Sequence, residues 1–306
     1  MIAALLLMIV AGIGLTQAVC DPNAVTLRWL RLGGILAVTF GAVALAATVI
    51  GDMNEQKLPA SRSIDAILIV LVVLLPAIVQ LLTVQVGERT MQRVAAGASF
   101  VILGGVAWGA VAAIAITDAP PANHNTLIDN TAISPENPNS NSPATNSTSP
   151  SNPKTSTSKS TSLLRNFSLL ISTYLSAGLL GGFLMTMLLG HAYLTAGNEM
   201  TQAPFRRLIV MIAVLLLLRT LGSVVFGLIP WLNRPPSNHN LWPTMLVTTR
   251  FAVGILVAGI FTYMIHDCVK RRANQSATGI LYVAAVLIII GEMVAISLCT
   301  STPYAF

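Results

Sequence analysis

Eight apolar runs, each of about 20 residues, constrain the fold of this chain more than any other feature of its sequence. They cover residues 2–20, 29–50, 64–86, 94–117, 166–190, 206–230, 244–266 and 277–299. A helix needs roughly 20 mostly apolar residues to cross the hydrocarbon core of a membrane. The runs lack the alternating pattern of barrel strands, and unpaired backbone groups are costly in lipid. We therefore expect every run to be a helix.

The composition supports this interpretation. Of the 306 residues, 54% are hydrophobic and only 9% are charged, whereas a soluble domain carries roughly 25% charged residues. The chain therefore lacks the polar surface that a globule in water needs. The sequence predicts an all-α, polytopic transmembrane bundle of about eight spans, with the lipid bilayer as its partner. No Lys or Arg precedes the first run, so we interpret it as a span rather than a cleaved signal peptide.

A polar tract divides the chain. Residues 119–163 are rich in Ser, Thr, Asn and Pro, and a segment with so little to bury is expected to be disordered. The predicted domains are an N-terminal four-helix half (1–118), the linker (119–163) and a C-terminal four-helix half (164–306). The linker contains one formal glycosylation site, at Asn146, although a passive tether is the simpler interpretation.

Basic residues set the expected orientation, because cytoplasmic loops collect Lys and Arg. One side of the membrane would carry Arg28, Arg31, Arg89, Arg93, Arg206, Arg207, Lys270, Arg271 and Arg272. We expect this side to be cytoplasmic in a bacterial plasma (inner) membrane, with both termini and the linker outside. The net charge of +6 is confined to such short clusters, so we expect no nucleic-acid partner.

Three charged residues fall inside the apolar runs of the C-terminal half: Arg219, Arg250 and Glu292. Charges within a bilayer need partners or water and commonly mark functional sites. Arg250 and Glu292 lie at similar depth, so we expect an ion pair between them, with Arg219 deeper and less obviously matched. Two interpretations stay open. One is a pocket for an anionic or quinone-like ligand, with Glu292 carrying protons; the other is a structural ion pair that fixes helix register.

Two histidines, His191 and His266, close the fifth and seventh runs at the expected cytoplasmic interface. Histidine is an axial ligand of haem, so these are candidate ligands of haem b if the two helices are neighbours. The other interpretation is a pair of unrelated interfacial histidines. The cysteines form no metal-binding cluster, and Cys20 and Cys299 are both expected near the outer surface.

No nucleotide-binding, protease, esterase or EF-hand motif stands in a suitable context, so a stand-alone enzyme is not expected. The leading hypothesis is a membrane-embedded subunit of a respiratory or redox assembly. It would hold quinone, or haem b, in its C-terminal half beside other membrane subunits. The alternatives are a small-solute transporter or channel, and a non-catalytic scaffold or assembly factor. The buried charges and the histidines favour the first hypothesis, and Pro76 inside the third run favours transport.

Overall fold

The computed structural model of this chain is a stack of long helices. It describes residues 1–21, 24–54, 62–86, 89–117, 157–196, 201–233 and 241–302. Every regular element among these residues is a helix, which confirms the all-α prediction. Backbone groups that face lipid are thereby bonded within their own segment, as the bilayer requires.

Each half contributes four rods. The N-terminal half contains α1 (Ile2–Val19), α2 (Leu27–Asn54), α3 (Arg62–Val86) and α4 (Arg89–Thr117). The C-terminal half begins with α5 (Thr157–Ala196) and ends with α10 (Asn274–Ser301). Between them run two composite rods, each with a π-helical segment in its middle. The first is α6 (Ala203–Gly222), η3 (Ser223–Leu228) and α7 (Ile229–Leu232); the second is α8 (Leu241–Thr249), η5 (Arg250–Val257) and α9 (Ala258–Lys270).

Within the described part of the chain, seven rods are long and apolar enough to cross a membrane. The third expected span is α3, whose segment Val72–Val84 is apolar but shorter. The chain is therefore a multi-pass membrane protein. Each expected run falls on a helix, because uninterrupted apolar length is what a lipid-spanning helix needs.

One boundary differs from the prediction. Helix α5 begins at Thr157, inside the expected linker, and runs for 40 residues. At about 1.5 Å per residue it is roughly 60 Å long, about twice the thickness of the hydrocarbon core. Its first turns therefore extend beyond the apolar layer. Residues 118–156, with Asn146, lie outside the described residues, so the disorder of the linker stays a prediction.

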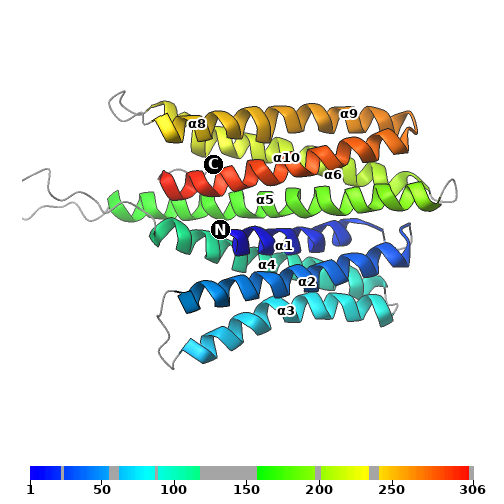
Figure 1. Ribbon diagram of the computed structural model, residues 1–306, viewed down its shortest axis with the longest axis horizontal. Coiled ribbons are helices and arrows are strands. Elements are labelled where there is room, and N and C mark those ends of the chain that lie inside the picture. Colours follow the sequence, from blue (N-terminus) through cyan, green and yellow to red (C-terminus); the bar gives the residue numbers. More distant parts are fainter. Residues whose placement is uncertain are drawn as a thin grey trace, which may run out of the picture.

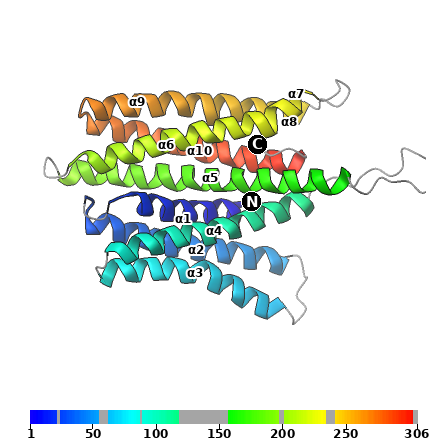
Figure 2. The same ribbon diagram turned by 180° about the vertical axis from the view of Figure 1, so that it is seen from behind.

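The rods lie side by side in a consistent order (Figures 1 and 2). Helices α2 and α3 form one edge, α8 and α9 form the other, and α1 and α5 lie in the middle. The helix ends that carry the basic residues expected on the cytoplasmic side lie at the end of the bundle opposite α8 and the C-terminus (Figure 1). Cys20 and Cys299, which were expected on the same side, lie at opposite ends of the bundle, since Cys20 follows α1 and Cys299 lies in the last turn of α10. The Cys20 thiol lies at the basic end because α1 crosses the bundle once from the N-terminus. Burial raises the pKa of this thiol to about 12, and the nearby charges of Arg207 and Arg93 oppose that rise.

The two halves meet through direct backbone contact between α1 and α5. A Cβ atom added at Gly12 would lie 1.8 Å from the carbonyl oxygen of Ala177. One added at Gly181 would lie 2.1 Å from the carbonyl carbon of Gly12. No side chain can be accommodated at those distances. Small residues at helix crossings permit such close approach and strengthen helix association in membranes.

We therefore predict that Gly12→Ala and Gly181→Ala each destabilise the protein. The added methyl group must push α1 away from α5, and overpacking of this kind costs about 1–3 kcal/mol or more. Thermal unfolding in detergent measures the effect. Gly97→Ala on α4 is the matched control, since nothing lies within 4 Å of its added Cβ atom. Equal unfolding temperatures for Gly12→Ala and Gly97→Ala would contradict the close contact.

Candidate functional site

Arg219, Arg250 and Glu292 meet in one buried ion cluster. Nη2 of Arg250 donates to Oε1 of Glu292 at 3.0 Å, which is the ion pair expected from their depth. Nη2 of Arg219 donates to Oε2 of the same carboxylate at 3.1 Å. The expectation that Arg219 is poorly matched was therefore wrong. Depth counted along the helix ignores the length of the arginine side chain, which reaches across to Glu292.

Hydroxyl groups complete the cluster. Ser176 on α5 donates from Oγ to Oε2 of Glu292 at 2.6 Å. Nη1 of Arg219 donates to Oγ of Ser223 at 3.3 Å. The carboxylate on α10 is thus bonded to groups from α5, α6 and η5. Sequence reasoning missed Ser176, because a lone serine in an apolar helix gives no signal of its own.

Two glycines allow this geometry. A Cβ atom added at Gly254 would lie 2.9 Å from Cα of Gly291, so η5 and α10 cross in close contact. A Cβ atom at either glycine would also lie 3.2 Å from Nη1 of Arg250. The crossing therefore leaves room for the guanidinium beside Glu292. Both π-helical segments start at the cluster, since η5 begins with Arg250 and η3 follows Arg219 by four residues. Such π turns are frequent at functional sites.

The cluster carries an unequal charge. Two guanidinium groups face one carboxylate, and all three residues are at most 3% exposed. Among the described residues, Nε and Nη1 of Arg250 have no hydrogen-bond partner. The cavity beside Arg219 and Glu292 measures only about 10 Å³, about enough for one water molecule. In this conformation the cluster is closed and both carboxylate oxygens are engaged. The arrangement is suited to fixing helices rather than to relaying protons.

The two candidate haem ligands are not brought together. His191 is exposed at the end of α5, and His266 is half-buried on α9. Helices α6 and α10 pack between α5 and α9 (Figures 1 and 2). The condition attached to the haem hypothesis, that these two helices be neighbours, is not met. Within the ranges that the structure describes, there is also no group of three or more His, Cys, Asp and Glu side chains suited to a metal ion.

His266 instead lines an apolar groove between α6 and the rod formed by η5 and α9. The groove has a volume of about 840 Å³. Its walls are mostly aliphatic, with Leu217 on α6 and Leu256 and Ile260 on the opposite rod. From Leu256 to His266 it follows ten residues of helix, or about 15 Å. The groove thus runs from the depth of the π-helical segments toward the basic end of the bundle.

The polar groups of the groove differ in their availability. The hydroxyls of Thr220 and Thr262 donate to carbonyl groups of their own helices, at 2.7 and 2.8 Å. Tyr263 is 74% exposed and lies three residues before His266, so the two side chains share one face of α9. The phenol and the imidazole are therefore the groups placed to donate hydrogen bonds to a ligand in the groove.

Comparison with known proteins gives no relative. No family model matches this chain, and neither a curated protein nor a solved structure is similar to it. The functional conclusion therefore rests on the geometry of its own residues.

The charge balance of the cluster generates a prediction about stability. Glu292→Gln leaves two buried guanidinium groups without a counter-ion, and breaking a buried pair in this way costs about 3–5 kcal/mol. Arg250→Met leaves the balanced pair of Arg219 and Glu292, so we expect a much smaller loss. Adding Arg250→Met to Glu292→Gln should restore part of the lost stability, because one of the two repelling cations is removed.

Thermal unfolding of the three variants in one detergent measures this order. The rescue is the informative comparison, since coupled residues give non-additive effects. A double variant less stable than Glu292→Gln alone would show that charge balance does not govern the cluster.

Proposed function

We propose that this protein is a membrane-embedded subunit of a respiratory or redox assembly and that its C-terminal half holds a quinone. The ligand would lie in the groove between α6 and the η5–α9 rod. The observation that carries this proposal is the pairing of a long aliphatic groove with two hydrogen-bonding side chains at one end. A quinone has the same division, with an apolar isoprenoid tail and a ring bearing two carbonyl acceptors.

The ring would lie at the end of the groove marked by Tyr263 and His266. Ligand sites of this kind are mostly apolar, with few polar groups that fix orientation. The tail would extend along Leu256 and Leu217 toward the centre of the bilayer. In the orientation expected from the basic loops, the ring lies in the cytoplasmic leaflet of a bacterial inner membrane, and both termini are outside.

The ion cluster supports this site indirectly. Arg219 directly precedes Thr220, which lines the deep end of the groove. On the opposite wall, Arg250 lies in the same π-helical segment as Ile255, which lines the groove. Because both arginines bind Glu292, the two walls are held at a fixed separation. In this proposal Arg219, Arg250 and Glu292 position the helices and do not touch the ligand.

A scaffold or assembly factor is the second candidate, favoured by the closed state of the cluster. A transport path along the buried charges would need open space, whereas the cavity beside Arg219 and Glu292 measures only about 10 Å³. A scaffold needs no ligand in the groove. Filling the groove therefore distinguishes the two candidates.

We predict that Gly259→Leu blocks quinone binding without unfolding the protein. Gly259 lines the groove, and nothing lies within 4 Å of its added Cβ atom, so a larger side chain projects into open space. Titration with a short-tailed ubiquinone and a short-tailed menaquinone, followed by thermal shift, measures affinity. We expect binding to wild type and a loss of about tenfold or more in the variant, since a steric block removes most of the favourable contact.

Gly279→Leu is the matched control, because its added Cβ atom also meets nothing within 4 Å and it does not line the groove. His266→Ala should weaken binding by removing a donor to the ring. Failure of wild type to bind either quinone, or equal binding by wild type and Gly259→Leu, would reject the quinone site and favour the scaffold.

A further inference from the structure

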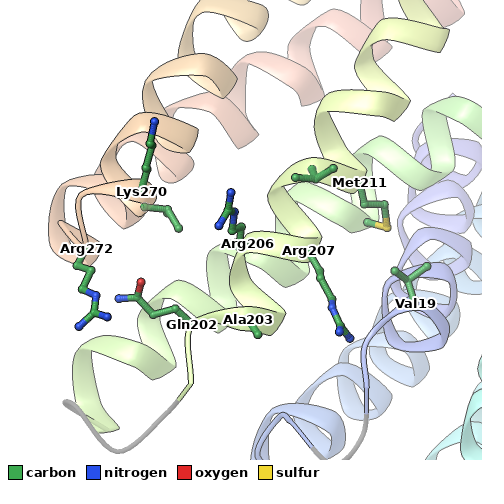
Figure 3. A pocket seen from close by; sticks show the side chains of 10 residues that line it. Val19, Gln202, Ala203, Arg206, Arg207, Met211, Lys270 and Arg272 are labelled. Carbon is green, nitrogen blue, oxygen red and sulfur yellow. The ribbon is translucent and has the colours of Figure 1, made fainter.

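A second large cavity lies at the basic end of the bundle. It opens around the first turn of α6, between the end of α1 and the end of α9 (Figure 3). Its volume is about 820 Å³. Four cationic side chains line it: Arg206, Arg207, Lys270 and Arg272. Figure 3 shows Arg207 extending down from α6 toward the side of α1 that carries Val19, and Arg206 on the side that faces α9.

Among the residues that the structure describes, the lining of this cavity contains four cations and no carboxylate. Two acidic residues at this end of the bundle are bonded elsewhere. Asp267 binds Arg271 at 2.9 Å, and Asp21 binds Arg93 at 3.3 Å. Neither Arg93 nor Arg271 lines the cavity. Four cations within one concave surface therefore favour an anionic occupant.

The backbone adds to this preference. Helix α6 begins at Ala203, which lines the cavity, and Gln202 at its N-cap makes no side-chain capping bond. The N-terminal end of a helix carries partial positive charge, so the dipole of α6 adds to the field of the four cations. Arg272 has a φ of 61°. A residue in this left-handed conformation does not continue an α-helix. The chain therefore turns away from α9 at Arg272, which lines the cavity two residues after the helix ends.

The rest of the lining indicates a lipid rather than a free ion. Val210 and Met211 lie one turn further along α6 than Arg206 and Arg207, and Val19 and Val269 add apolar surface beside the cations. All four belong to rods that cross the membrane. Val210 also lines the apolar groove, so the cavity continues toward the lipid. A site with cations at the helix ends and aliphatic walls beneath matches the headgroup and first methylene groups of a phospholipid.

We propose that this cavity binds the headgroup of an anionic phospholipid from the leaflet at the basic end of the bundle. Arg206 and Lys270 would contact the phosphate. Since Val19 belongs to α1 and the other lining residues belong to the C-terminal half, the lipid would also bridge the two halves. The cavity shares Val210 with the quinone groove, but its four cations do not line that groove, and the lipid proposal does not depend on quinone binding.

The test compares lipid retention in native mass spectrometry, with phosphatidylglycerol and phosphatidylcholine added to the purified protein in micelles. We expect wild type to retain phosphatidylglycerol at least fivefold better than phosphatidylcholine. The double variant Arg206→Gln, Lys270→Gln should lose that preference. The matched control is Arg28→Gln, Arg31→Gln, which removes the same charge from exposed residues outside the cavity.

Two further variants keep the result interpretable. The charge-retaining exchange Arg206→Lys, Lys270→Arg should keep the preference, and Gly259→Leu should keep it as well. Three outcomes would overturn the proposal. Wild type could retain both lipids equally, or the Arg28 and Arg31 control could lose the preference to the same extent. Inorganic phosphate at about 10 mM, in excess over a site of micromolar affinity, could also displace phosphatidylglycerol. The first two outcomes indicate non-specific attraction, and the third indicates a site for free anions.

Discussion

Glu292 is the anion around which the C-terminal half is organised. A guanidinium group cannot be left alone in hydrocarbon, where charge is costly and partners are few. Both buried arginines, Arg219 and Arg250, therefore have to meet this one carboxylate. The segments α6, η5 and α10 must approach closely enough for direct bonds, and Ser176 brings in α5 as well. The helix arrangement is thus dictated by one small polar contact.

The π-helical segments follow from the same requirement. A π turn holds an additional residue, so the side chains before and after it are rotated relative to those of an α-helix. In the η5–α9 rod this allows Arg250 to face Glu292 while Leu256 and Ile260 face the groove. The rod thereby carries a buried charge on one side and lines the apolar groove on the other.

The sequence predicts the spans well and their neighbours poorly. Apolar length fixes which residues lie in lipid, and the common depth of Arg250 and Glu292 predicted their pairing. The side-by-side order of helices depends on side-chain and backbone contacts that hydropathy does not contain. For that reason the meeting of Gly12 with Gly181 was not foreseen, and the neighbour condition for His191 and His266 failed. The role of Ser176 was hidden for the same reason.

The two halves pair their buried polar side chains in different ways: the N-terminal half uses neutral amides and the C-terminal half uses charges. In the N-terminal half Gln17 accepts from Gln80 at 2.5 Å and donates to the carbonyl of Leu30 at 3.0 Å, so the contact is neutral. A neutral amide network needs no counter-ion and exerts little field on its surroundings. The charged cluster and the walls of the groove belong to the C-terminal half. Under the proposed function, the C-terminal half would bind the ligand and the N-terminal half would support the bundle. Direct contact, such as the bond from Nε1 of Trp29 to the carbonyl of Met185 at 3.1 Å, makes the two halves one packed unit.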